Sequence, residues 1–148
     1  MKLAIGCDHA GYSLKEALKS YLVDKGFDIV DMGTDGPESV DYPDFVHPVS
    51  LAIIDGSVDL GILICGSGNG VSMTANKYTE VRCAICWNPE IAVLSREHNN
   101  ANALAIPARF VELNEAYKIV DSFCESSFEG GRHERRIGKM APKLDHYC

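Results

Sequence analysis

Long apolar runs are missing from this sequence. None approaches the roughly 20 consecutive residues that a membrane-spanning helix requires, and residues 1–9 turn polar before the apolar region of a secretory signal could form. Internal repeats, low-complexity tracts and linkers are missing as well. We therefore expect a cytoplasmic protein that has no membrane partner and that folds as one domain over residues 1–148.

Positive charge is also scarce. The chain has 14 Lys and Arg residues against 21 Asp and Glu residues, for a formal net charge of -7. A nucleic-acid partner is not expected, because binding to a phosphate backbone needs a basic face. The basic residues are unevenly spread, however, and five of the 14 lie between residues 132 and 143: Arg132, Arg135, Arg136, Lys139 and Lys143. This segment indicates a local use of positive charge.

The six cysteines do not outline a small disulfide-bonded domain. They are scattered through strand and helix patterns, which favours reduced thiols in a cytosolic protein: Cys7, Cys65, Cys83, Cys86, Cys124 and Cys148. Cys83 and Cys86 have the C-x-x-C spacing of some zinc and redox sites, but they lie in a strand pattern. Residues three apart in a strand face opposite sides, so we expect no metal there and no cofactor in the protein.

Short apolar runs alternate with segments of helical period along the whole chain. The pattern predicts strands over residues 2–6, 27–31, 60–64, 81–86 and 103–106, and helices over residues 12–25, 45–55, 71–77, 89–97 and 113–124. A final helix begins near Arg132, after Gly130 and Gly131. This alternation predicts an α/β protein with a doubly wound, five-stranded parallel sheet of the Rossmann or flavodoxin-like type, strand order 2-1-3-4-5, and an extra C-terminal helix.

That topology predicts where a ligand binds. In such sheets the ligand lies beyond the carboxyl ends of the strands, at the point between the first and third strands where the order reverses. Asp8 and His9 follow the first strand and Cys65 closes the third, so we expect them side by side. His98 and Asn99 lie where the fourth helix ends, and we expect them near the same edge of the sheet.

Cys65 runs directly into a glycine-rich loop, Gly66-Ser67-Gly68-Asn69-Gly70. Backbone N–H groups of such a loop can surround an anion, although glycine turns after strands are also common for tight packing alone. The loop fits neither the Walker A pattern nor the dinucleotide-binding pattern. A thiol near a helix N-terminus should be more acidic than a free thiol, whose pKa is about 8.5, so Cys65 can act as a base or as a nucleophile.

Arg132 and Arg136 are four residues apart and share one face of the predicted last helix. Two guanidinium groups on one face suit a phosphate, because each offers paired donors. The alternative is an ordinary solvated, charged face. The otherwise acidic composition favours the phosphate site.

Taken together, five motifs make the chain similar to the family of ribose-5-phosphate isomerase B, which includes the galactose-6-phosphate isomerase subunits. The motifs are Gly6-Cys7-Asp8-His9-Ala10-Gly11, Asp41-Tyr42-Pro43, Cys65-Gly66-Ser67-Gly68-Asn69-Gly70, His98-Asn99, and Gly130-Gly131-Arg132-His133 with Arg136. The similarity extends over nearly the whole chain. It implies an aldose–ketose isomerase that interconverts ribose 5-phosphate and ribulose 5-phosphate through an enediolate, without a metal.

The resemblance also implies roles for individual residues. Cys65 is the base that moves a proton between C2 and C1, and His98 assists opening of the sugar ring. The expected substrate-binding residues are Asp8, His9, Tyr42, Gly66, Ser67, Gly68, Asn69, Gly70, Asn99, Arg109, Arg132 and Arg136. The arginines would hold the 5-phosphate, and the Ser67 hydroxyl could relay a proton between O1 and O2. The partner is a small sugar phosphate, and a homodimer or homotetramer would share its sites between chains.

Three other functions share some of these residues. A six-carbon substrate such as allose 6-phosphate or galactose 6-phosphate remains open, because the length of the pocket is not readable from the sequence. A non-catalytic sugar-phosphate sensor would keep the arginines and the glycine loop but would not need Cys65 or His98. A low-molecular-weight phosphatase would need an arginine six residues after the cysteine, where this chain has Val71.

Overall fold

A computed structural model describes residues 1–141 of the 148, so Lys143 and Cys148 lie outside the described residues. Five parallel strands form one sheet: β1 (Lys2–Cys7), β2 (Asp28–Asp31), β3 (Leu60–Cys65), β4 (Cys83–Ile85) and β5 (Ala103–Pro107). The helices are α1 (Tyr12–Asp24), α2 (Tyr42–Ile54), α3 (Asn69–Ala75), α4 (Pro89–Asn99), α5 (Leu113–Glu125) and α6 (Arg132–Ile137). This confirms the predicted doubly wound α/β fold, including the additional helix near the C-terminus.

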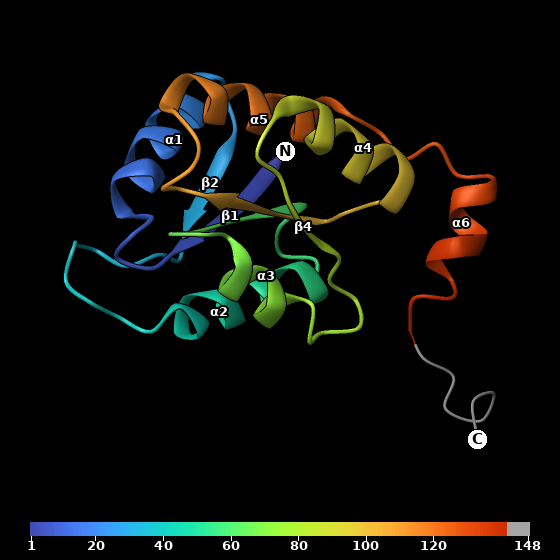
Figure 1. Ribbon diagram of the computed structural model, residues 1–148, viewed down its shortest axis with the longest axis horizontal. Coiled ribbons are helices and arrows are strands. Elements are labelled where there is room, and N and C mark those ends of the chain that lie inside the picture. Colours follow the sequence, from blue (N-terminus) through green and yellow to red (C-terminus); the bar gives the residue numbers. More distant parts are fainter. Residues whose placement is uncertain (142–148) are drawn as a thin grey trace.

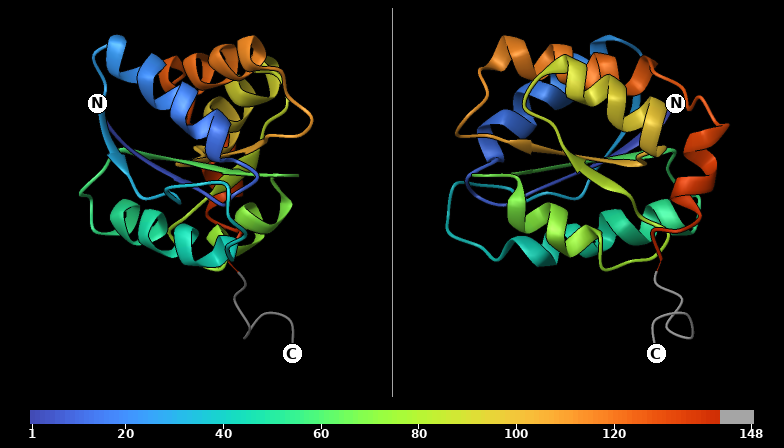
Figure 2. Two further views of the ribbon diagram at one scale, coloured as in Figure 1. Left: turned by 90° about the vertical axis from the view of Figure 1, so that its left-hand side faces the viewer. Right: turned by 45° about the vertical axis from the view of Figure 1, so that its right-hand side comes forward.

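The helices form two layers around the sheet. Helices α1, α4 and α5 cover one face and α2 and α3 cover the other, while α6 stands beside the sheet next to the end of α4 (Figures 1 and 2). Two helices have a proline in their first turn, Pro43 in α2 and Pro89 in α4, where a missing N–H costs nothing. Among residues 1–141, no helix combines the length and the apolar character needed to cross a bilayer.

The order of the last two strands corrects the prediction. The observed order is β2-β1-β3-β5-β4, with the fourth and fifth strands exchanged relative to 2-1-3-4-5. All residues of β5 are buried, whereas β4 is only three residues long and leaves Ala84 and Ile85 partly exposed. A strand buried on both faces belongs inside a sheet, and the short strand can form the edge. The neighbours β1 and β3 are as predicted, so the expected ligand edge is unchanged.

The core consists of two apolar clusters, one on each side of the sheet. Leu22 of α1 and Phe123 of α5 belong to the first, and Val49 of α2 belongs to the second. Cys86 lies in the first cluster and Cys83 in the second, which confirms that this C-x-x-C pair points to opposite faces. The five cysteines among the described residues are all free and buried.

Candidate active site

The carboxyl ends of β1 and β3 bring the first group of site residues together. Asp8 and His9 follow β1 directly, and Cys65 is the last residue of β3. The N–H of Asp8 donates to the carbonyl of Ile64 at 3.3 Å, so the two strand ends are joined where the polar residues begin. The predicted grouping of Asp8, His9 and Cys65 at one edge of the sheet is confirmed.

Cys65 meets a turn whose backbone faces its sulfur. The N–H of Gly68 donates to Sγ of Cys65 at 3.2 Å, and the thiol is only 5% exposed. Gly68 adopts φ 74°, a left-handed conformation that a side chain disfavours, and it precedes the first residue of α3. Ser67 is exposed, and its Oγ accepts the N–H of Asn69 at 3.4 Å. The helix begins at Asn69, two residues earlier than predicted.

The outer glycines of the loop are sites of close approach. A Cβ at Gly66 would lie 3.1 Å from Cζ of Arg109, so this guanidinium rests against the residue that follows Cys65. A Cβ at Gly70 would lie 2.6 Å from Cζ of Tyr42, whose ring covers the start of α3. Arg109 comes from the loop after β5 and Tyr42 from the start of α2. Both therefore reach the same edge as Cys65.

Asp8 and His9 are held by backbone donors. Oδ1 of Asp8 accepts the N–H groups of Ala10 at 2.9 Å and Gly11 at 3.1 Å, which fixes the turn into α1 and leaves Oδ2 available. Nδ1 of His9 accepts the N–H of Val40 at 3.3 Å. A neutral imidazole that accepts at Nδ1 carries its proton on Nε2, so His9 presents an N–H donor at its other nitrogen.

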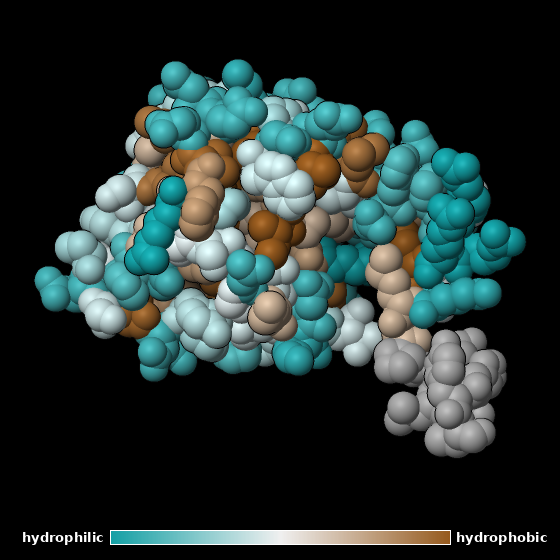
Figure 3. Space-filling view, viewed as in Figure 1, coloured by the Kyte–Doolittle hydropathy of each residue, from teal (hydrophilic) through white to brown (hydrophobic). Residues whose placement is uncertain are grey.

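A second group of polar residues gathers where α4 ends and α6 begins. The rings of His98 and His133 stack in parallel, with centroids 4.2 Å apart and an angle of 5° between them. Glu129 places Oε2 at 3.6 Å from Nε2 of His133 and 3.9 Å from Nε2 of His98. Arg132 and Arg136 are exposed on α6, where Figure 3 shows hydrophilic side chains gathered. This group is rich in donors and positive charge.

The placement of His98 corrects the prediction that it lies near Cys65. Helix α4 leaves the carboxyl end of β4 and runs back along the sheet to enter β5, so its last residues lie at the amino edge. Figure 1 shows this end of α4 beside α6, on the opposite side from the start of α3. His98, Asn99, Arg132 and Arg136 of one chain are therefore separated from its own Cys65 by the length of the sheet.

Comparisons with known proteins agree with the fold and the motifs. A family model described as Ribose/Galactose Isomerase matches residues 3–140. The chain belongs to this family. It is 46% identical over 136 residues to ribose-5-phosphate isomerase B of Escherichia coli (strain K12), a match that covers 92% of this chain and 91% of that protein.

Solved structures of the ribose/galactose isomerase family have the same fold. Ribose-5-phosphate isomerase B of Clostridium thermocellum is 47% identical, with a TM-score of 0.95 and 100% of both chains covered. The Mycoplasma genitalium ribose-5-phosphate isomerase B with bound ribulose-5-phosphate is 45% identical, with a TM-score of 0.90 and coverage of 94% of this chain and 93% of that one.

The other four thiols among residues 1–141 of this family member are poorly suited to chemistry. Burial raises the pKa of Cys83 to about 12 and the pKa values of Cys7, Cys86 and Cys124 to about 11. At neutral pH these groups stay protonated, and a thiol is a weaker base and nucleophile than a thiolate. None of these four lies at the glycine turn, so Cys65 is the one described cysteine beside it.

Two members of the second group were not among the predicted site residues. His133 is 6% exposed, and its burial together with the neighbouring His98 and Arg132 lowers its pKa, so the neutral ring is favoured. Glu129 is four residues before His133, a spacing visible in the sequence. The stacking of His133 on His98 joins segments far apart in the chain, and no sequence pattern indicates it.

His98, Glu129 and His133 are the described residues that could hold a metal ion, since their ligand atoms lie within 4.8 Å of one another. The parallel stacking of the two histidine rings argues against a metal site in this family member. In-plane lone pairs of two parallel rings do not converge on one point, and Nε2 of His133 already lies 3.3 Å from the Nε donor of Arg132. Binding an ion would require the rings to turn.

Proposed function

We propose that the protein is an aldose–ketose isomerase that interconverts ribose 5-phosphate and ribulose 5-phosphate, with Cys65 as the base. The observation that carries this proposal is the sulfur of Cys65 at the end of β3, facing the N–H of Gly68 in the glycine turn. Membership of the ribose/galactose isomerase family supports the same reaction. So does ribulose-5-phosphate bound to the Mycoplasma genitalium relative.

The reaction needs a base and a set of fixed donors. The Cys65 thiolate removes the proton from C2 of the open aldose and returns it to C1, while the proton on the O2 hydroxyl moves to O1 through the Ser67 hydroxyl. The enediolate formed in between carries negative charge on oxygen. Backbone N–H groups of the turn at Gly66 to Gly70 can stabilise that charge, and one such donor is typically worth about 3 to 4 kcal/mol.

The second group supplies the side chains for ring opening and phosphate binding, which the cysteine turn lacks. His98 is 36% exposed and stacked on a buried ring, a placement suited to proton transfer with the ring oxygen of the closed sugar. Asn99 next to it can donate to a hydroxyl. Arg132 and Arg136 offer bidentate donors for the 5-phosphate, which orients the reacting carbons from a distance. At the cysteine edge, Asp8, His9, Tyr42 and Arg109 complete the contacts.

The two groups must come from two copies of the chain. Within one copy they lie at opposite ends of the sheet, so a sugar phosphate bound at Cys65 cannot reach its own His98 (Figure 1). A homodimer or homotetramer in which α4 and α6 of one subunit cover the carboxyl edge of another would form complete sites. The free, buried cysteines fit the reducing cytoplasm, where we place this assembly.

A side-by-side turnover assay tests the substrate. Ribose 5-phosphate, allose 6-phosphate and galactose 6-phosphate are compared at equal enzyme concentration, and kcat/KM is measured for each. We expect the highest kcat/KM with ribose 5-phosphate. A higher kcat/KM with a six-carbon substrate would reassign the enzyme within its family. Binding of all three without turnover would instead indicate a sugar-phosphate sensor.

A further inference from the structure

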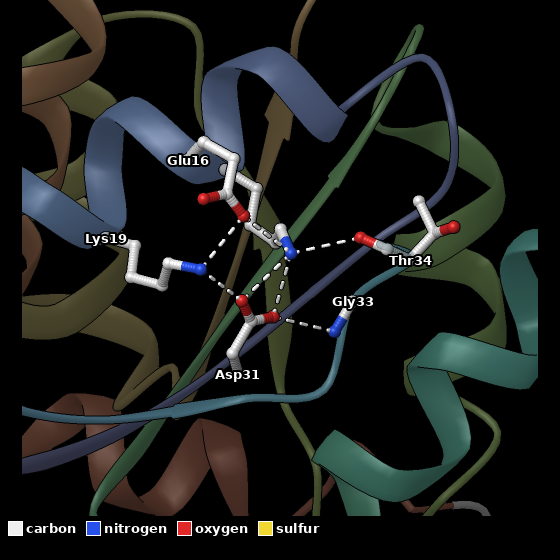
Figure 4. Close-up of polar contacts among 6 residues, drawn as sticks. Glu16, Lys19, Asp31, Gly33 and Thr34 are labelled. Atoms are coloured by element: carbon white, nitrogen blue, oxygen red, sulfur yellow. Dashed lines mark hydrogen bonds and ion pairs between the residues drawn. The ribbon is translucent and has the colours of Figure 1, made fainter. Parts of the chain in front are cut away.

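Lys15 is a fully buried lysine that the proposed reaction does not use. It lies in the second turn of α1, its side chain is 1% exposed, and it is among the largest fully buried side chains. Burying a charge is costly unless it is paired and hydrogen-bonded. Its ammonium is fully engaged: 2.9 and 3.1 Å to the two oxygens of Asp31, 3.0 Å to the carbonyl of Thr34, and 2.9 Å to Oε1 of Glu16 (Figure 4).

The charge on Lys15 is maintained at neutral pH. Burial acts to lower its pKa, but the hydrogen bonds to Asp31 and Glu16 outweigh burial and the pKa lies above the ordinary value of 10.5. Lys19 donates to the same carboxylates, at 2.8 Å to Asp31 and 2.9 Å to Glu16. The result is a network of two cations and two carboxylates between α1 and the end of β2.

This network fixes the start of the loop between β2 and α2, residues 32–41. Oδ1 of Asp31 accepts the N–H of Gly33 at 3.0 Å, and Lys15 holds the carbonyl of Thr34. The N–H of Thr34 donates to the carbonyl of Cys7 at 3.1 Å, one residue before Asp8. The loop is thereby attached to the end of β1 as well as to α1.

The far end of the same loop reaches the site. Val40 donates its N–H to Nδ1 of His9, and Tyr42, just after the loop, lies against Gly70. Between these contacts and Lys15 the loop has no strand or helix of its own. Its path therefore depends on where its first residues are held.

The packing at this anchor is tight. A Cβ at Gly33 would lie 2.7 Å from Cδ of Lys15 and 2.8 Å from Sγ of Cys7. Real Cβ atoms do not approach so closely, so any side chain at Gly33 must displace the loop or the lysine stem. The distance between α1 and the loop is therefore fixed at Gly33.

We propose that Lys15 is a positioning residue, which anchors the 32–41 loop so that Val40 holds His9 in its Nε2–H form and Tyr42 covers Gly70. It touches no reacting atom and acts through the loop alone. Its importance for turnover rests on the proposed function, in which His9 and Tyr42 contact the sugar. Its effect on the His9 ring does not depend on that function.

The test compares a double variant with a matched control. Lys15→Met with Asp31→Asn removes the buried pair without leaving either charge alone. Lys25→Met with Asp121→Asn makes the same two changes at another pair, between the end of α1 and α5, whose charged atoms are 2.6 Å apart. Long-range 1H–15N NMR spectra report which ring nitrogen of His9 carries the proton, with the signals assigned through a His9→Gln variant.

We expect the wild type and the control to show His9 as the Nε2–H form, and the Lys15 variant to show a mixture of both forms. Its kcat/KM for ribose 5-phosphate should fall about 10- to 100-fold, because small misplacements of contact residues cost rates of this order. A folded variant with an unchanged His9 ring would overturn the proposal. A changed ring in an enzyme whose wild type does not turn over ribose 5-phosphate would instead refute only the proposed function.

If the double variant does not fold, Gly33→Ala provides the same test. It keeps all charged groups and displaces the loop by the contacts given above. Gly36→Ala is its control, since a Cβ there meets nothing within 4 Å. In Gly33→Ala we expect a mixture of the two protonated forms of the His9 ring. In Gly36→Ala we expect the Nε2–H form alone. A normal His9 ring in both variants would contradict the anchoring role.

Discussion

Cys65 differs from the other described cysteines in its partner rather than in its burial. It is 5% exposed, comparable with Cys124 at 8%, but its sulfur accepts a backbone N–H at the mouth of the glycine turn. The other thiols are buried away from that turn and stay protonated because burial raises their pKa values. At the scale of single residues, the contact with the glycine turn distinguishes the proposed base.

Replacing Cys65 by alanine should therefore lower the conversion of ribose 5-phosphate at least about 10²-fold, since general acid–base catalysis typically contributes 10²–10⁴-fold. The natural control is Cys124→Ala, which removes an equally buried thiol from α5 and should leave kcat unchanged. Turnover is followed by the absorbance of the ketose product. A Cys65→Ala variant with nearly normal turnover would remove this residue from the mechanism.

Gly70 provides a second prediction at this scale. A Cβ at Gly70 would lie 2.6 Å from the Tyr42 ring, so Gly70→Ala must push the ring away from the start of α3. We expect a fall in kcat/KM of roughly 10-fold, from a loss of alignment at the sugar. Combining Gly70→Ala with Tyr42→Ala should cost no more than Tyr42→Ala alone, because the clash is then gone. Additive losses would show that the two residues act independently.

At the scale of elements, the ion-pair network joins α1 to β2 and should be visible in acid stability. Burial opposes the charge of Asp31, but hydrogen bonds from Lys19 and Lys15 hold its pKa below the ordinary value of 3.8. Hydrogen bonds from the same two lysines lower the pKa of Glu16 from 4.5. Carboxyl groups with lowered pKa values stabilise the fold above those ordinary values and lose that contribution as the pH falls through the lowered ones.

The free energy of unfolding of the wild type should therefore exceed that of the Lys15→Met/Asp31→Asn variant by more at about pH 6 than at about pH 2.5. Urea titrations at the two pH values measure this difference. The Lys25→Met/Asp121→Asn variant, which removes a different ion pair, serves for comparison. If the gap between wild type and Lys15 variant is the same at both pH values, the network does not contribute through these carboxylates.

The elements also show which parts of the site and the fold can be predicted from the sequence. Cys65 ends β3 and Asp8 directly follows β1, so parallel topology alone places them at one edge. His98 lies at the end of a helix, and the helix of a crossover returns to the amino edge before the next strand begins, which is why the expected placement was wrong. The exchange of β4 and β5 depends on which of two short apolar strands is covered on both faces. That is decided by packing, which local pattern does not reveal.

At the scale of the whole molecule, the two halves of the proposed site lie at opposite edges of one sheet. The sequence motifs identify the residues of both halves, and the fold separates them. The stacking of His133 on His98 and the nearby carboxylate of Glu129 further define the second half, and these contacts arise only from tertiary structure. Under the proposed function, a complete site requires a second chain, and assembly is then a condition for catalysis.

Mixing two inactive variants tests this central claim most directly. Cys65→Ala disables the proton-transfer half and His98→Asn disables the ring-opening half, so each homodimer has only defective sites. A mixed dimer would contain one intact site, and random exchange of subunits should restore about a quarter of wild-type activity. Subunit exchange is followed independently by mass spectrometry of the intact assemblies. Recovery to that level is the predicted result; mixed assemblies that form but remain as inactive as the two parents would contradict a site shared between chains.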